Sequence, residues 1–249
     1  MADIKKQKLP TFTTPKLVFK FPKLIEPDFG STEYPKPDGE FSTKGVAKLS
    51  DPAVQAFLQK LTPLHAEAIE KAEEEFKKLK VETRKKLGGV KVNDLFTTLY
   101  DQETEEETGE IEFKFSMKHR IEIKKGPSAG KVIIKYPALF DAKGKPIIVR
   151  DKKGKPLPNA PQIWSGTEGK VSFEASPYFI PGTGAAGLKL NLLAVQIIDL
   201  VSGGQRSASS YGFGEEDGFS ADDLDTNETS EDTEADENGD EASDDEDDF

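Results

Sequence analysis

The sequence predicts a mainly β domain, a small closed barrel or a sandwich of short antiparallel strands, with one α-helix. Three observations predict it. Apolar and polar residues alternate with a period of two in several segments, which is typical of half-buried strands. Turns rich in glycine, proline and lysine separate these segments at regular intervals. One long segment has the three- and four-residue spacing of an amphipathic helix, which would cover an open end of the barrel.

The first two predicted strands lie before this helix. Leu17, Phe19 and Phe21 share one face of the first strand. Pro22 lies near its end, which suits an edge or terminal position. Residues 26–39 contain three prolines and two glycines and are predicted to form a loop. The second strand would then have an inward face made of alternate residues, namely Phe41, Thr43, Gly45, Ala47 and Leu49.

The predicted helix occupies residues 51–87. Asp51 is a capping residue, and a proline follows it in the first turn, where the missing amide donor costs nothing. The pair Gly88-Gly89 would end the helix. Pro63 interrupts the pattern, so we expect a kink or a break into two helices near Leu61.

The chain beyond residue 110 alternates again. Phe113 and Phe115 lie on the apolar face of a strand that begins near Ile111. Further strands are predicted at 131–136, 146–150, 170–176 and 188–200. Residues 182–187 match the dinucleotide pattern G-x-G-x-x-G, but a strand follows them instead of the required helix. We therefore expect a hairpin loop there.

Charge is distributed very unevenly along the chain. The whole sequence has 34 basic and 46 acidic residues, a net charge of −12. Nineteen of the carboxylates lie in residues 215–249, which contain no lysine or arginine, so residues 1–214 have a net charge of +7. A block of like charge with few apolar residues cannot bury enough surface to offset its ordering entropy. We predict a domain of residues 1–206, with residues 1–15 mobile, and a disordered acidic tail of residues 207–249.

Enzymatic and metal-dependent functions have little support in the sequence. There is no cysteine, and His65 and His119 are too far apart to suggest a metal site. Serine-elbow and Walker patterns are missing, and the tail carboxylates lack the positioned pair that acid–base catalysis needs. No segment has the roughly 18 apolar residues of a membrane span, and the start of the chain has no secretory signal. We expect a protein that is not an enzyme, needs no cofactor and works in the cytoplasm.

The remaining features indicate binding of nucleic acid by cations on the outer faces of strands. The candidate DNA-binding cations are Lys114, Lys118, Arg120, Lys131, Lys135 and Lys189. Cations that follow a phosphate backbone, together with aromatic side chains that stack on bases, bind single strands with little sequence preference. Any one of these lysines could equally be an ordinary solvated strand residue.

Two aromatic residues are candidates for base stacking. Phe173 and Ala175 share the inward parity of their strand, which turns Tyr178 outward. Trp164 lies in a polar loop, where complete burial is difficult. For both residues, packing within the fold is the alternative to stacking.

Several short motifs occur in one order over most of the chain. They are Ile25-Glu26-Pro27-Asp28-Phe29-Gly30, Asp51-Pro52 at the helix start, Pro158-Asn159-Ala160-Pro161-Gln162-Ile163-Trp164-Ser165-Gly166, Ser176-Pro177-Tyr178 and the terminal Asp-Glu-Asp-Asp-Phe. In this combination the chain resembles the bacteriophage single-stranded DNA-binding proteins of the gene 2.5 family. The resemblance implies a five-stranded antiparallel OB-fold barrel with one capping helix. The early helix departs from the commoner OB arrangement, which places the helix between the third and fourth strands.

The resemblance also implies a function in phage DNA replication, recombination and repair. The family coats single-stranded DNA, promotes strand annealing, and contacts the replicative polymerase and the helicase/primase through its tail. The tyrosine that contacts DNA carries over to Tyr178; two residues later, where the family can have tryptophan, this chain has Ile180. The terminal phenylalanine carries over to Phe249, with Asp247 and Asp248 beside it as partner-binding residues. We expect the tail to compete with DNA for the basic groove.

Two other functions fit the same residues. An acidic-tailed chaperone or assembly protein would bind basic clients, and an OB module of the cold-shock kind would bind RNA or duplexes. The sequence leaves the oligomeric state open, with a homodimer as one option. The expected location is the cytoplasm of an infected bacterial host.

Overall fold

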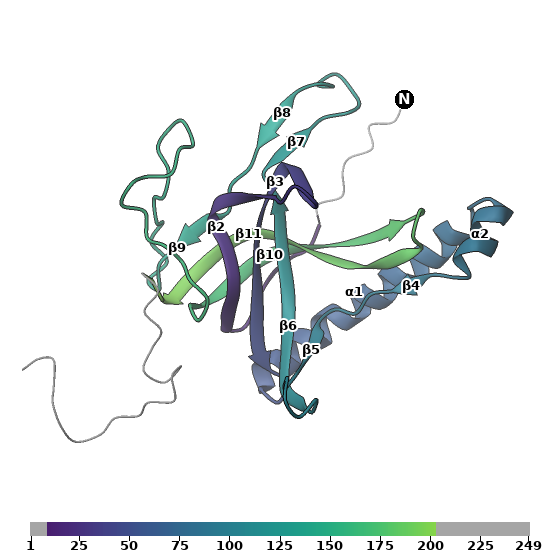
Figure 1. Cartoon of the computed structure of the whole chain (residues 1–249), viewed down its shortest axis with the longest axis horizontal. Coiled ribbons are helices and arrows are strands. Elements are labelled where there is room, and N and C mark those ends of the chain that lie inside the picture. Colours follow the sequence, from purple (N-terminus) through teal and green to yellow (C-terminus); the bar gives the residue numbers. More distant parts are fainter. Residues whose placement is uncertain (1–8, 203–249) are drawn as a thin grey trace, which may run out of the picture. The chain divides into compact units, whose positions relative to one another are not determined.

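Five long strands close into a barrel in the computed structural model, which describes residues 9–202 (Figure 1). The predicted tail, with Asp247, Asp248 and Phe249, lies outside the described residues. The barrel strands are β2 (Leu17–Gly30), β3 (Pro35–Lys48), β6 (Glu107–Lys118), β10 (Glu168–Ile180) and β11 (Ala185–Asp199). They are joined in the order β10-β2-β3-β6-β11-β10. The predicted five-stranded barrel is confirmed, with one junction, β6–β11, parallel instead of antiparallel.

Phenylalanine side chains fill the barrel. Phe19, Phe41, Phe113, Phe115 and Phe173 are all completely buried. They come from alternate positions of four strands, because successive side chains of a strand point to opposite faces. The Phe115 and Phe173 rings are 5.2 Å apart, so the core joins β6 to β10. The period-two pattern therefore identified these five core residues correctly.

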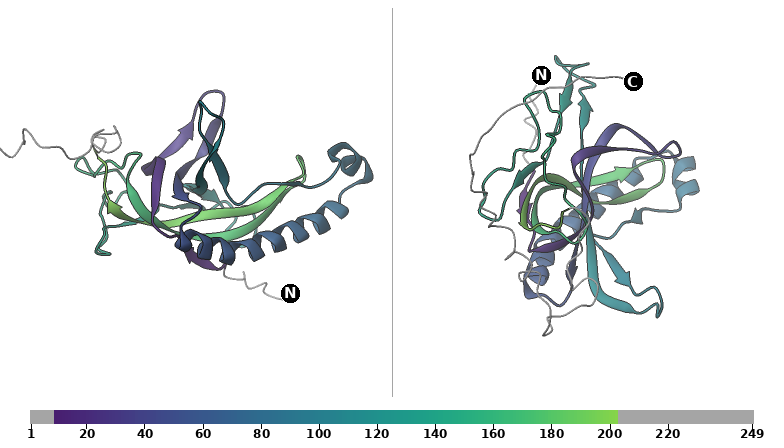
Figure 2. Two further views of the ribbon diagram at one scale, coloured as in Figure 1. Left: turned by 90° about the horizontal axis from the view of Figure 1, so that it is seen from below. Right: turned by 60° about the vertical axis from the view of Figure 1, so that its left-hand side comes forward.

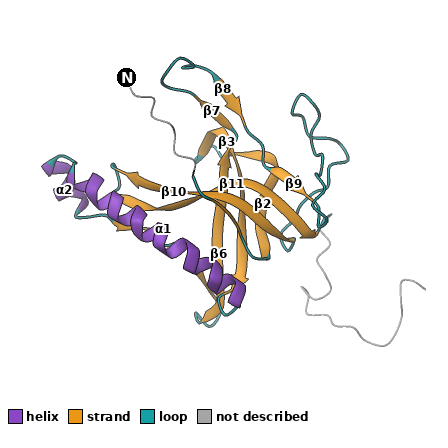
Figure 3. Cartoon of the chain, turned by 180° about the vertical axis from the view of Figure 1, so that it is seen from behind, coloured by secondary structure: helices purple, strands orange, loops and turns teal. Residues whose placement is uncertain are grey.

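Helix α1 (Pro52–Lys77) packs against β10 and β11 and extends beyond the barrel beside the hairpin that they form (Figures 2 and 3). Asp51 accepts a hydrogen bond from the Ala53 amide at 2.8 Å, as expected of a cap. Phe57 anchors the helix, because its ring meets those of Phe113 and Phe173 edge-on at 5.5 and 5.9 Å.

The predicted break near Leu61 is wrong. α1 continues through Pro63, and the helix ends at Lys77, before α2 (Val81–Leu87) begins. Proline removes one amide donor, but Leu61 and Ala68 are buried on either side of it and hold this part of the helix against the sheet. Gly88, at φ +77°, ends α2 as predicted.

Two predictions for the first part of the chain are also wrong. Residues 26–39 extend β2 and β3 into a long hairpin, with a turn at residues 31–34. Part of the N-terminal segment expected to be mobile forms strand β1 (Thr11–Thr13), which pairs with β10. The Phe12 ring stacks on Phe173 at 5.7 Å, and this contact explains why the segment is ordered.

The remaining strands are short. They are β4 (Lys91–Val92), β5 (Thr97–Tyr100), β7 (Arg120–Glu122), β8 (Val132–Ile134) and β9 (Ala138–Phe140). The strand predicted at 146–150 forms only isolated bridges, and residues 181–184 form the expected hairpin turn between β10 and β11.

Two nearly identical turns occupy the segment before β10. Asp141 accepts hydrogen bonds from the amides of Lys143 and Lys145, and Asp151 accepts the same pair from Lys153 and Lys155. The sequences Asp-Ala-Lys-Gly-Lys-Pro and Asp-Lys-Lys-Gly-Lys-Pro thus form two copies of one lysine-bearing turn.

Arg150 ties this segment to the barrel. Its guanidinium lies 4.4 Å from the Tyr136 ring and 5.1 Å from the Phe41 ring, and it donates to the carbonyls of Leu24 and Ile25. Burial lowers the pKa of Arg150, an effect opposed by Tyr136 and by Glu26. The side chain is therefore a structural anchor of β2 and β3.

The contact between helix and barrel predicts a large effect for Phe57→Ala. Removing a buried ring that touches two core rings should lower the free energy of unfolding by about 3–5 kcal/mol. Gln59→Ala, on the exposed face of the same helix, is the matched control and should change it by less than about 0.5 kcal/mol. Chemical denaturation measures both variants, and similar small losses would contradict the packing described.

Candidate nucleic-acid interface

A groove of about 750 Å³ crosses the outer face of the barrel. It runs over β3 and β6 and is bounded by the β10–β11 hairpin and by the segment between β4 and β5. Its lining residues are Glu40, Lys44, Asn93, Asp94, Leu95, Phe96, Thr97, Glu112, Lys114, Ser116, Tyr178, Ile180, Leu188, Lys189 and Leu190. Of the residues predicted to bind DNA, the groove contains Tyr178, Lys114 and Lys189.

Three lysines form a row across adjacent strands in this groove. Lys44 lies directly opposite Lys114 in the β3–β6 ladder. Phe115 pairs with Leu190 between β6 and β11, so Lys189, one residue earlier, lies next to Lys114. Because Phe115 and Leu190 are buried, the adjacent lysines point outward. Like charges on facing positions destabilise a sheet, and an anion bound across the row would relieve this cost.

Carboxylates lie among these cations. The groove is lined by three carboxylates as well as three lysines. The Lys44 ammonium is 2.8 Å from Glu112, and Glu40 is 3.3 Å from Lys36. Among residues 9–202, neither Lys114 nor Lys189 has an ion-pair partner. The cationic side of the groove is therefore at β6 and β11.

Tyr178 lies at one end of the groove and is half-buried. Its hydroxyl accepts a hydrogen bond from the Asn93 side chain at 2.6 Å. The backbone N–H of Asn93 donates to the Ala186 carbonyl at 2.8 Å, and this bond holds the segment around Asn93 along β11. A Cβ at Gly187 would approach the Tyr178 ring to 3.3 Å, so the glycine gives the ring space. Tyr178 is thus held in a fixed orientation beside the lysine row.

Trp164 does not lie in this groove. It lines a separate pocket of about 500 Å³ together with Phe21, Lys23, Ser165 and Val201. Its side chain is 45% exposed, so part of the ring is accessible to a ligand.

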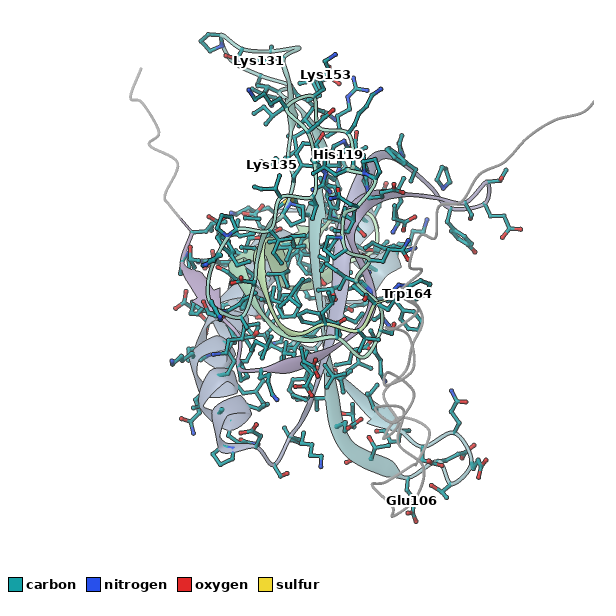
Figure 4. The ribbon with its side chains drawn as sticks, turned by 90° about the vertical axis from the view of Figure 1, so that its left-hand side faces the viewer. Glu106, His119, Lys131, Lys135, Lys153 and Trp164 are labelled. Carbon is teal, nitrogen blue, oxygen red and sulfur yellow. The ribbon has the colours of Figure 1, made fainter. Side chains whose placement is uncertain are left out.

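Several predicted cations also lie elsewhere. Arg120 is on β7, and Lys131 and Lys135 flank β8; these two strands form a separate small sheet. Figure 4 shows Lys131 near the tip of this projecting hairpin, far from Trp164 on the barrel. Lys118 is on the barrel but its ammonium is 3.0 Å from Asp38. Of the six predicted cations, Lys114 and Lys189 therefore line the groove, and the predicted single strand through Arg120 is wrong because the chain leaves the barrel after Lys118.

Sequence reasoning missed several residues of this surface. The predictions for the second strand covered only its inward-facing residues. Lys44 lies between two of them, so alternation predicts that it points outward. Asn93 and Phe96 lie between two short strands that have no clear pattern. Phe21 was placed on the inner face but is 69% exposed, because β2 has an irregular register after Lys20.

Other kinds of site are not found in the described part of the chain. Within residues 9–202 there is no group of three or more histidines, aspartates or glutamates arranged to hold a metal ion. None of the helices there is long and apolar enough to span a membrane.

The topology and the groove define the class of protein. A five-stranded barrel with a binding surface over its second and third strands, bordered by the turn between the fourth and fifth, is an OB-fold of the kind that binds oligonucleotides. The helix lies between the second and third barrel strands, after the two strands that the sequence predicted before it and not in the commoner OB position between the third and fourth strands.

Residues 19–200 match the family described as "Single-stranded DNA-binding protein, Bacteriophage T7". The chain therefore belongs to this family of single-stranded DNA-binding proteins, and the resemblance noted in the sequence is confirmed.

One solved structure supports the fold, and a second has a weaker similarity. The crystal structure of gp2.5, a single-stranded DNA-binding protein encoded by bacteriophage T7, is similar with a TM-score of 0.56 and 21% identity, over 86% of this chain and 100% of that one. The single-stranded DNA-binding protein of bacteriophage Enc34 in complex with ssDNA has a TM-score of 0.43 and 10% identity, over 79% of this chain and 89% of that one. No curated protein sequence matches.

The lysine row predicts the salt dependence of binding. Lys114→Gln and Lys189→Gln should each weaken binding to oligo-dT and reduce the slope of log affinity against log salt by about 0.7, because one phosphate contact is lost. Lys60→Gln, exposed on α1, is the control and should leave the slope unchanged. Fluorescence anisotropy at several salt concentrations measures the slopes. Unchanged slopes in both groove variants would show that DNA lies elsewhere.

Tyr178 should contribute through its ring. Tyr178→Ala is expected to weaken oligo-dT binding by roughly 1–3 kcal/mol, the value of one stacked base. Tyr178→Phe keeps the ring and should retain most of the affinity, although the Asn93 side chain loses its hydrogen-bond acceptor. Anisotropy titrations compare the two variants. Equal losses would assign the effect to the hydroxyl instead of stacking.

Proposed function

We propose that this protein coats single-stranded DNA without sequence preference through the groove over β3, β6 and β11. The observation that carries the proposal is the row of Lys44, Lys114 and Lys189 beside the fixed ring of Tyr178. Lysines would neutralise successive phosphates, and the ring would stack on a base of any identity. The apolar residues of the groove favour a single strand over a duplex, because the bases of a single strand are free to contact them.

The biological setting of this activity is DNA replication, recombination and repair of a phage, in the cytoplasm of its bacterial host. Membership of a phage single-stranded DNA-binding family supports this proposal. A protein that holds single strands extended with their bases accessible would also promote annealing of complementary strands. A homodimer would present two such grooves to the DNA.

The acidic end of the chain would regulate the groove. Residues 215–249 hold nineteen carboxylates and no lysine or arginine, so they mimic the charge of a nucleic acid. Being covalently attached, they would compete with DNA at an effective concentration on the order of millimolar. DNA binding would release Asp247, Asp248 and Phe249 to bind the replicative polymerase and the helicase/primase.

A comparison of ligands tests the proposed function. The full-length protein should bind labelled oligo-dT more tightly than a duplex of the same length or an oligo-U RNA. Equal or tighter binding of duplex or RNA would instead favour a cold-shock type module. Binding of basic proteins without binding of DNA would favour an acidic-tailed chaperone.

Deletion of residues 215–249 should tighten the binding of oligo-dT at low salt, and the gain should shrink as salt screens the tail. A variant that replaces the nineteen carboxylates by their amides has the same length and is the matched control; it should reproduce the effect of the deletion. Phe249→Ala should leave DNA affinity unchanged and weaken only the binding of the partner polymerase. Equal affinity of full-length and truncated protein at low salt would contradict competition by the tail.

A further inference from the structure

Phe21 has an unusual backbone and side-chain conformation. Its φ is +50°, and within residues 9–202 the only other non-glycine residue with positive φ is Glu105. Its ring is 69% exposed, although the alternation of β2 would direct it inward. Both features cost free energy: a bulky residue rarely adopts positive φ, and a phenylalanine ring gains from burial. Such costly conformations gather at functional sites.

A β-bulge produces this conformation. Lys20 pairs with Lys44 and Lys23 pairs with Ser42, so β2 has one more residue than β3 over this interval. Bulges of this kind redirect a side chain. The freed Phe21 amide donates to the Ser165 hydroxyl at 2.9 Å, which fixes the turned-out residue against the loop that carries Trp164.

Trp164 is also fixed by hydrogen bonds, two through its backbone and one through its indole ring. Its backbone amide donates to the Val201 carbonyl at 3.0 Å, and its own carbonyl accepts from the Thr167 amide at 3.2 Å. The indole Nε1 donates to the Gln162 side chain at 3.2 Å. Phe21 and Trp164 line the same pocket of about 500 Å³, so two exposed aromatic rings share one preformed concavity.

This pocket continues the surface of the groove. The Lys44 ammonium, which lines the groove, lies 6.0 Å from the centre of the Phe21 ring. The strands β11, β6, β3 and β2 are neighbours in that order, with a spacing of about 4.8 Å. A line across the barrel therefore passes from Lys189 and Lys114 to Lys44 and then to Phe21.

We propose that Phe21 and Trp164 form a second stacking site, which takes a nucleobase of the same single strand that occupies the Tyr178 groove. The inference rests on the proposed function and extends it. Exposed Lys23 lines the pocket and Lys44 borders it, and this positive charge suits the phosphates on either side of a stacked base. Rigid aromatic rings next to cations are what sequence-tolerant binding of single strands requires. The site makes the DNA path cross four strands of the barrel.

The chain contains a single tryptophan, which makes the site directly observable. Saturating the full-length protein with dT16, a length at the upper end of the roughly 4–16 nucleotides that one OB-fold covers, should quench Trp164 fluorescence. Labelled dT16 followed by anisotropy reports binding independently. Binding without any change of the tryptophan emission would overturn the second site and leave the proposed function intact. Absence of binding would overturn both.

Variants test the contribution of each ring. Phe21→Gly removes the ring but tolerates positive φ, so the fold should be retained and the affinity for dT16 should fall at least about fivefold. Trp164→Leu should cause a loss of similar size. Phe21→Tyr keeps an aromatic ring and should retain most of the wild-type affinity for dT16. Tyr100→Ala, which removes an exposed ring on β5 beside Glu107, is the matched control and should have no effect.

The binding of a shorter oligonucleotide separates the two sites. For dT4, Phe21→Gly should have little effect while Tyr178→Ala still weakens binding, because a short strand fills only the groove. Wild-type affinity of both Phe21→Gly and Trp164→Leu for dT16 would refute the second site, whatever the result for Tyr178. Thermal unfolding of each variant confirms that the affinities refer to folded protein.

Discussion

Closure of five strands around a phenylalanine core is the constraint on which the rest of the structure depends. Once Phe115 and Leu190 face each other inside the barrel, Lys114 and Lys189 must lie side by side outside it. The same alternation sets Lys44 opposite Lys114. A slip of one residue in β6 would bury Lys114 and expose Phe113 and Phe115, so the interior packing protects the register of the lysine row.

The binding face balances stability against affinity. Lys44 is held by Glu112, and only part of the lysine row is without an ion pair in the described part of the chain. A phosphate bound at Lys44 would have to displace this carboxylate, which would weaken binding; without a ligand, the ion pair reduces the repulsion among three neighbouring lysines. Fixed aromatic rings compensate, because stacking depends little on salt or on base identity. A protein with the proposed function of coating strands of any sequence would benefit from combining ion pairs with stacking in this way.

Local irregularities of the barrel coincide with the residues that we propose to bind DNA. The bulge in β2 turns out Phe21, and the close approach of Gly187 makes room for Tyr178. Arg150, packed on two aromatic rings, anchors the irregular segment that leads to Trp164. In regular strands these side chains would be buried or scattered. Positions where local preference is overruled are expected at functional sites.

The sequence by itself determined which residues face the core, because side-chain alternation is a local property of an extended chain. The inward direction of Phe113, Phe115 and Phe173 and the outward direction of Tyr178 followed from it, and the helix start followed from the capping residue Asp51. Motifs that are separately weak also indicated the family when taken in order. Parity does not say which strands are neighbours, so it could not place Lys189 beside Lys114 or show that Arg120, Lys131 and Lys135 leave the barrel. Only the tertiary structure decided these neighbours, the bulge at Phe21 and the continuous helix at Pro63, because each depends on contacts between segments far apart in the chain.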